Sequence, residues 1–199
     1  MFVEQKVWGI DFGSKLAGTT VVAYEVNGQV HFKASAKKQD ADQMIRDLAA
    51  ELNPVLIGID APLSLPGVYT SKPGFDDHFY RLCDKATKAM SPMFLGGLTA
   101  RAMKLAGVLQ GAGSELIEVY PVNSGVELGL KAHGYRTKSP DLDQIIRALT
   151  AHSGLTVNSD HSELTGHHID AWLALITTRH YQAGKARQAG HAEEGLIYY

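Results

Sequence analysis

Cysteine is nearly absent from this sequence, and long apolar runs are absent altogether. Cys83 is the only cysteine among 199 residues, which excludes a disulfide within the chain and a cysteine-based zinc site. No segment approaches the roughly 18 apolar residues that a membrane span needs. Residues 1–6 lack the apolar run of a signal peptide. These absences predict a soluble protein of a reducing, cytoplasmic compartment without a membrane partner.

Net charge is also low. The formal charge of −2 at pH 7 excludes a strong general attraction to nucleic acid or to anionic membranes. A polyanionic substrate therefore needs bound cations or a local basic patch. The nine histidines are scattered without zinc-ligand spacing. With 45% hydrophobic residues, the chain is long enough for one domain with a sizeable core.

Two apolar stretches do stand out, because each ends in Gly-Ile-Asp, at Asp11 and at Asp60. Side chains alternate along a strand, so Asp11 shares a face with Gly9, and Asp60 shares a face with Gly58. We expect the missing glycine side chains to leave room beside the carboxylates. A lone buried carboxylate is costly or takes up a proton, so the pair is predicted to face one small polar pocket. The alternative is that each acid caps the turn after its strand.

The remaining pattern predicts a domain of alternating strands and helices. Three antiparallel strands open it, joined in part by an Asn27-Gly28 hairpin turn. Asp40 is predicted to cap a helix that ends at Asn53-Pro54, so the next strand can lie parallel to the first by a right-handed crossover. The predicted strands cover residues 6–12, 19–26, 29–34, 55–60, 116–121 and 194–199, and the predicted helices cover 40–53, 79–90, 99–109, 141–149 and 165–176. The last strand either joins the sheet edge or is offered to a partner, so the oligomeric state stays open.

Two further acids lie in apolar elements. Glu118 shares a strand face with Leu116 and Tyr120. Asp170 lies in the second turn of a helix that is apolar nearly all round, and His167 lies one turn before it on the same side.

Several carboxylates together suit Mg²⁺ or Mn²⁺. Two such ions about 4 Å apart stabilise the attacking and leaving oxygens of an in-line phosphoryl displacement. In that scheme Asp11 bridges the ions, Asp60 and Asp170 each hold one, and Glu118 binds metal or positions water. His167 or His168 orients the nucleophile or shuttles a proton, although a histidine near a helix start is more often a cap or a packing residue.

The segment 67–110 is locally basic. Its cations are Lys72, Arg81, Lys85, Lys88, Arg101 and Lys104, against Asp76, Asp77 and Asp84. The segment is predicted to be either a solvated helix face or a lid that contacts substrate. Lys15, Arg81 and Lys85 are candidate phosphate contacts.

The order of elements, with acids on the first, fourth and fifth strands and on the last long helix, resembles the ribonuclease H-like fold. This is an α/β fold whose mixed central sheet, with three antiparallel N-terminal strands and then parallel strands, is flanked by helices. Short motifs further resemble the domain-of-unknown-function 429 (DUF429) family, described as predicted nucleases of this fold. The motifs are Gly9-Ile10-Asp11, Ile59-Asp60-Ala61-Pro62-Leu63-Ser64-Leu65-Pro66, Arg81-Leu82-Cys83-Asp84, Ile117-Glu118-Val119-Tyr120-Pro121 and His168-Ile169-Asp170-Ala171.

This resemblance implies one domain over residues 1–199, with an insertion at about 67–110. It implies a metal-dependent nuclease in which Asp11, Asp60, Glu118 and Asp170 hold divalent metal and nucleic acid, DNA or RNA, is the substrate. The spacing of His167 and Asp170 resembles the end of a Holliday junction resolvase site. The family's first turn carries an arginine, whose place passes here to Lys15.

Two other readings stay open. The segment 9–20 also resembles the phosphate-binding hairpin of actin-like ATPases and sugar kinases, which share the core topology. Those proteins need two such domains and a second Asp-x-Gly loop, whereas Asp60-Ala61-Pro62 has no glycine. The third reading is a non-catalytic ribonuclease H-like module that binds a partner through its basic segment.

Overall fold

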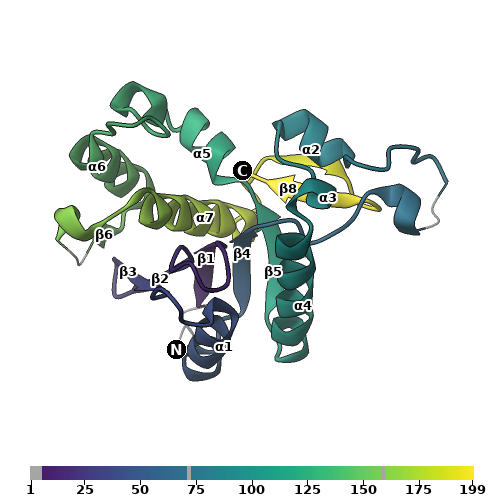
Figure 1. The fold of residues 1–199 in the computed structure, drawn as a ribbon. Helices are drawn as coiled ribbons and strands as arrows, with labels where there is room; N and C mark the ends of the chain where they lie inside the picture. Colours follow the sequence, from purple (N-terminus) through teal and green to yellow (C-terminus); the bar gives the residue numbers. More distant parts are fainter. Residues whose placement is uncertain (1–5, 71–72, 158–159) are drawn as a thin grey trace.

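The computed structural model of the protein describes residues 6–70, 73–157 and 160–199. Its centre is a sheet with the strand order β6-β3-β2-β1-β4-β5-β8-β7 (Figure 1). The strands are β1 Val7–Asp11, β2 Val21–Val26, β3 Gln29–Ala34, β4 Leu56–Asp60, β5 Glu115–Val119, β6 Thr156–Val157, β7 Gln188–His191 and β8 Gly195–Tyr198. The α-helices are α1 Ala41–Leu52, α2 Leu82–Thr87, α3 Pro92–Leu95, α4 Gly97–Gly111, α5 Pro121–Glu127, α6 Leu142–Ser153 and α7 Gly166–Gln182. Short 3₁₀ helices are η1 Gly67–Thr70, η2 Leu130–His133 and η3 His161–Glu163.

Strand pairing confirms the predicted mixed sheet. β2 is antiparallel to both β1 and β3, whereas β1, β4 and β5 run parallel to one another. The central order 3-2-1-4-5 with β2 reversed is the ribonuclease H-like arrangement. Asn27 and Gly28 have φ angles of 52° and 76°, as the central residues of a type I′ hairpin turn require. Local turn chemistry therefore accounts for the antiparallel pairing of β2 with β3.

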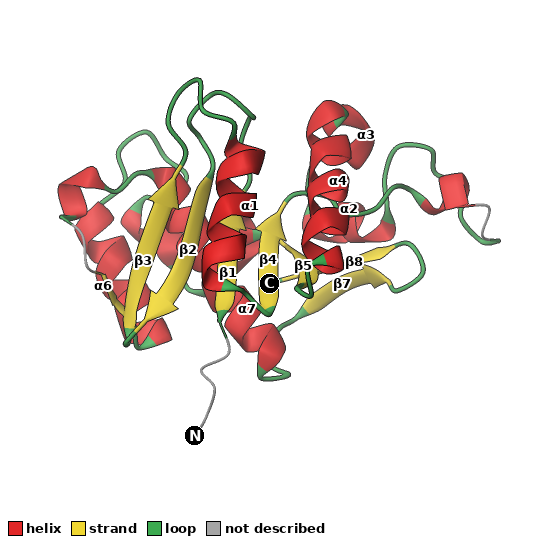
Figure 2. Ribbon diagram, turned by 90° about the horizontal axis from the view of Figure 1, so that it is seen from below, coloured by secondary structure: helices red, strands yellow, loops and turns green. Residues whose placement is uncertain are grey.

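Helices cover both faces of the sheet. Helix α7, with α5 and α6 beyond it, lies on one face, and α1 and α4 lie on the other (Figures 1 and 2). Side chains of β1 alternate between the two cores: Val7 belongs to the core under α7, whereas Trp8 and Ile10 belong to the core under α1 and α4. Asp11 is on the α7 face by the same alternation.

Gly9 and Gly58 allow α7 to pack directly on the backbones of β1 and β4. A Cβ atom at Gly9 would lie 2.0 Å from the backbone nitrogen of Leu175, and one at Gly58 would lie 2.0 Å from Thr178 Oγ1. The expectation that these glycines leave room beside the carboxylates is therefore wrong, because the helix occupies that space.

The segment 67–110 differs from its prediction in detail. The helix predicted over residues 79–90 is only α2, because Arg81 is extended (φ −79°, ψ 161°) and Lys88 is left-handed (φ 60°). Ser91 caps the short helix α3, and Pro92 is its first residue; the sequence periodicity did not indicate this helix. Lys72 lies outside the described residues, as does most of the N-terminal stretch on which the signal-peptide expectation rests.

The C-terminal strand is confirmed, but it is half of a hairpin. β8 pairs in parallel with β5, and β7, which the sequence pattern did not indicate, pairs antiparallel to β8. The hairpin lies against α2 (Figure 1). Among the helices of the described ranges, none combines the length and apolarity that crossing a membrane requires.

Candidate functional site

Asp11 and Asp60 lie side by side at the carboxyl ends of two parallel strands. They are the last residues of β1 and β4, and their Cα atoms are direct partners in the sheet register. Both side chains line a cleft of about 340 Å³. The carboxyl ends of parallel strands are where α/β folds place their ligand sites. The predicted convergence of these two acids is therefore a property of the sheet itself.

Asp60 has a half-buried carboxylate without a donor. Within the described ranges its side chain has no hydrogen bond and no ion pair, although its backbone is paired in the sheet. Desolvation raises the pKa of Asp60 well above its ordinary value, and the negative charges of Asp11 and Asp170 raise it further. A carboxylate in this situation either holds a proton or needs a cation.

Asp170 brings a third carboxylate from helix α7 close enough to this pair for its charge to act on Asp60, although it lines a neighbouring cleft. Its side chain is buried, and its two oxygens have different partners: the Tyr135 hydroxyl donates to Oδ1 at 2.6 Å, and Arg136 Nη2 lies 3.0 Å from Oδ2. Desolvation raises the pKa of Asp170 to about 6, although Arg136 and Tyr135 oppose the shift. Asp11, Asp60 and Asp170 are called the acid cluster below.

The two adjacent histidines have separate roles. His167 Nδ1 lies 2.7 Å from Asp11 Oδ2, and this hydrogen bond raises the pKa of His167. His168 Nδ1 instead accepts from the Thr165 backbone at 3.1 Å, and the His168 ring packs edge-on against Phe32. His167 therefore belongs with the acid cluster, and His168 is the helix cap that the sequence left as the ordinary alternative.

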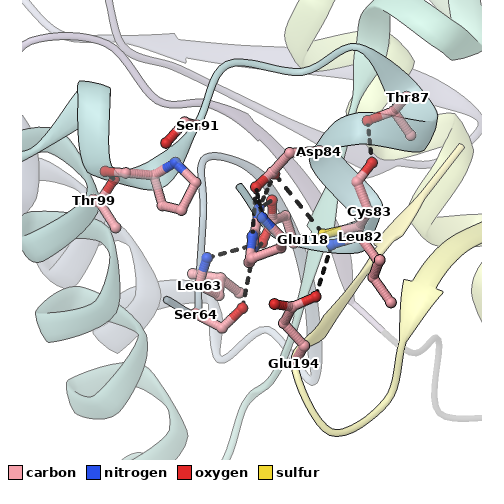
Figure 3. Close-up of polar contacts among 12 residues, drawn as sticks. Leu63, Ser64, Leu82, Cys83, Asp84, Thr87, Ser91, Thr99, Glu118 and Glu194 are labelled. Atoms are coloured by element: carbon pink, nitrogen blue, oxygen red, sulfur yellow. Dashed lines mark hydrogen bonds and ion pairs between the residues drawn. The ribbon is translucent and has the colours of Figure 1, made fainter. Parts of the chain in front are cut away.

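Glu118 is held away from the acid cluster, whereas the sequence pattern predicts it as a fourth metal ligand. Its Cα pairs with Ile59 in the sheet register, and Ile59 points into the core on the α1 and α4 side. Glu118 borders the cleft, but both of its oxygens bind Arg81, at 2.6 and 2.7 Å. The Leu63 amide donates a third bond at 2.9 Å (Figure 3). The oxygens that would bind metal are thus already engaged.

The candidate phosphate contacts are also paired within the protein. Arg81 is completely buried between Glu118 and Asp84, so it does not reach a substrate. Lys15 is exposed and bound to Asp40, the cap of α1, at 2.9 Å. Lys85 is bound to Asp77 at 2.6 Å. None of these three lines the cleft of Asp11 and Asp60 or the neighbouring cleft of Asp170.

Tyr135 and Arg136 are site residues that the sequence did not single out. They follow η2 in a polar loop, where no periodicity indicates which side chain turns inward. Tyr135 is 6% exposed, and its hydroxyl reaches Asp170. The presence of a tyrosine in an otherwise polar loop is the one signal that could have pointed to this contact.

The acid cluster suits a divalent cation by its donor chemistry. Three carboxylates are hard oxygen ligands of the kind that Mg²⁺ and Mn²⁺ prefer, and Asp60 has no competing donor among the described residues. Across the described ranges, however, no three His, Cys, Asp or Glu side chains converge closely enough to hold a metal ion as they stand. Binding therefore requires that side chains of the cluster move toward one another.

Asp60→Asn is expected to stabilise the metal-free protein at pH 7, because it removes a carboxylate charge that is poorly solvated and lies near two other negative charges. The midpoint of thermal unfolding should rise by at least about 2–4 °C, the shift that 1 kcal/mol produces in a chain of this size. The folded-state pKa of Asp60 is raised, so the folded wild type keeps its proton more readily and loses stability as pH rises. The gain should accordingly vanish near pH 4. Asp47→Asn, an exposed change on α1, is the control; equal gains at both pH values would contradict the prediction.

Comparison with protein families supports the predicted resemblance to the DUF429 family. Residues 9–94 match the family described as "Protein of unknown function (DUF429)". Among solved structures, the chain is similar to the Thermus thermophilus RuvC structure, with 16% sequence identity and a TM-score of 0.46, over 93% of this chain and 98% of that one. No curated protein matches the chain.

Proposed function

We propose that this protein, whose residues 9–94 match the DUF429 family, is a divalent-metal-dependent nuclease that hydrolyses phosphodiester bonds at the acid cluster. The observation that carries the proposal is the unpaired carboxylate of Asp60 beside Asp11 and Asp170. Three acids whose charges act on one another beside the strand ends destabilise the metal-free fold. Such an arrangement is typical of a site kept for function rather than for stability.

Asp11, Asp60 and Asp170 would hold Mg²⁺ or Mn²⁺ in this proposal. The cation supplies, when bound, a positive charge that activates water and offsets negative charge on the phosphodiester oxygens. Asp11 and Asp60 are fixed by the sheet, since their strands are hydrogen-bonded neighbours. Asp170 is fixed by α7 and by the Tyr135 hydroxyl. The ligands therefore come from rigid elements, which favours a defined geometry.

His167 is the proposed proton-transfer group. Its Nδ1 is engaged by Asp11, so Nε2 is the ring atom left to exchange a proton with water or with a leaving oxygen. The pKa of His167 is raised by the hydrogen bond to Asp11, which favours a protonated ring near neutral pH. Glu118 has a structural role in this proposal, because its oxygens are bound to Arg81.

The test is cleavage of a mixed panel of substrates: single-stranded and duplex DNA, RNA, a hybrid duplex and a four-way junction, each with Mg²⁺ or Mn²⁺. We expect metal-dependent cleavage by the wild type and by the control Asp47→Asn. Asp60→Asn should cut at least about a hundredfold more slowly, since it removes one of the charged groups that act in the transition state. The same Mn²⁺ that supports cleavage should raise the unfolding midpoint of the wild type.

Two results would contradict the nuclease. One is cleavage that Asp60→Asn leaves unchanged, which would indicate a contaminating enzyme or another site. The other is the absence of cleavage on every substrate at millimolar metal. The preferred substrate of an active wild type would name the class of nucleic acid.

A further inference from the structure

Arg136 brings a positive charge into contact with one member of the acid cluster and near another. Its Nη2 lies 3.0 Å from Asp170 Oδ2. It lines both the cleft that contains Asp11 and Asp60 and a neighbouring cleft of about 380 Å³ that contains Asp170 and His167. The arginine charge lowers the pKa of both Asp60 and Asp170 against the desolvation that raises them. The guanidinium thus lies where a bound cation would also interact with these acids.

The backbone and Tyr135 hold Arg136 in this position. Its φ angle is +66°, in the left-handed region that a residue with a long side chain rarely adopts. Outliers of this kind gather at functional sites, where the surroundings impose them. The guanidinium lies 5.6 Å from the centre of the Tyr135 ring, and Arg136 Nε is 3.4 Å from the Tyr135 hydroxyl. The same tyrosine therefore contacts both partners of the Arg136–Asp170 pair.

The two partners of this pair differ in their freedom to move. The Arg136 side chain is 49% exposed, whereas that of Asp170 is 7% exposed and fixed on α7. Arg136 can leave for water without opening a core, because its side chain already borders two open clefts. Asp170 cannot follow it without moving the helix that packs on β1. The cation, rather than the acid, is the exchangeable partner.

We infer that Arg136 is an internal counter-ion, which neutralises part of the acid cluster in the metal-free protein and which a divalent cation must displace. This inference rests on the metal site of the proposed function. It accounts for the absence, among the described residues, of a convergent set of ligands, since Asp170 is held by Arg136 and Tyr135 instead. Arg136 is a positioning residue in this account, and it sets how tightly the cluster binds metal.

The test is direct measurement of Mn²⁺ binding by calorimetric titration and by the electron paramagnetic resonance of free Mn²⁺, without substrate. Arg136→Gln removes the competing charge and should bind Mn²⁺ about tenfold more tightly than the wild type, as expected for a unit charge a few ångströms from the ion. Arg136→Lys keeps the charge and should bind Mn²⁺ within about threefold of the wild type. Arg179→Gln is the matched control, because Arg179 is a part-exposed arginine paired with a different acid, Glu25, at 3.4 Å.

Unchanged or weaker Mn²⁺ binding by Arg136→Gln would overturn the inference, as would tighter binding in Arg136→Lys or the absence of Mn²⁺ binding in every variant. Failure of the nuclease is distinguishable from these results. Tighter Mn²⁺ binding by Arg136→Gln without cleavage of any nucleic acid would support the counter-ion and reject the nuclease. Metal-dependent cleavage with unchanged Mn²⁺ affinity in Arg136→Gln would support the nuclease and reject the counter-ion.

Discussion

Gly9→Ala is expected to lower the free energy of unfolding by about 3–5 kcal/mol, which is a large loss for a single added methyl group. The added Cβ would lie 2.0 Å from the backbone nitrogen of Leu175 and 2.5 Å from the carbonyl oxygen of Ala171. Both obstacles are backbone atoms of α7, so no side-chain rotation relieves them and the helix must move off the sheet. Chemical denaturation of Gly9→Ala and of the wild type measures the difference.

Two further glycine variants sharpen this test. Gly107→Ala is the control, because that site is exposed within α4 and has no atom within 4 Å of its added Cβ; it should stabilise the protein by up to about 1 kcal/mol. At Gly58 the nearest obstacle is the Thr178 side chain, so Thr178→Ala should recover part of the loss in Gly58→Ala. A cost below about 1 kcal/mol for Gly9→Ala would show that α7 does not pack as closely as described.

Arg81→Met is expected to lower the free energy of unfolding by about 3–5 kcal/mol, the usual cost of leaving a buried charge without its partner. All five N–H groups of Arg81 are hydrogen-bonded, to Glu118, Asp84 and Ser64 at 2.6–3.2 Å. Burial already raises the pKa of Glu118 against the pull of Arg81. Without the arginine, two buried carboxylates would face each other with no cation.

The control for Arg81 is Arg101→Met, which breaks a pair with Asp42 whose distance is also 2.6 Å but whose side chains are partly exposed. It should cost less than about 1.5 kcal/mol. Adding Glu118→Gln to Arg81→Met should recover part of the lost stability. Glu118→Gln alone should retain the rise in unfolding midpoint that Mn²⁺ produces. Loss of that rise would return Glu118 to the metal ligands and reject the structural role given to it here.

The contrast between Asp60 and Glu118 shows what the sequence could predict about the site. Asp11 and Asp60 each end a five-residue strand in the motif Gly-Ile-Asp, and the two parallel strands are aligned end to end. The local sequence pattern was therefore sufficient to predict that the two acids lie together. Glu118 depends on the register between β4 and β5. A slip of one residue reverses the face of every side chain, and the observed pairing of Glu118 with Ile59 decides the question. No pattern within the strand 116–121 contains that information.

The same distinction applies to the rest of the fold. Strands, the Asn27-Gly28 turn and the cap of α1 follow from residues close together in the sequence, and the structure confirms them. Arg136 reaches Asp170 across 34 positions of sequence, from a loop without periodicity, and β7 carries a weak strand pattern that depends on β8. Such contacts are fixed by tertiary packing, which a single sequence does not express.

The C-terminal hairpin implies an order of assembly during synthesis on the ribosome. β8 covers the edge of β5, and the buried Glu194 carboxylate accepts hydrogen bonds from the amides of Gly67 and Leu82. Until β8 emerges after β5, the β5 strand has an open edge, the kind of exposed pairing surface that favours misassembly. Ile197 also lines the cleft beside Asp60. A nascent chain therefore contains the three acids of the cluster before it contains Ile197, so this side of the cleft closes only after β8 has paired with β5.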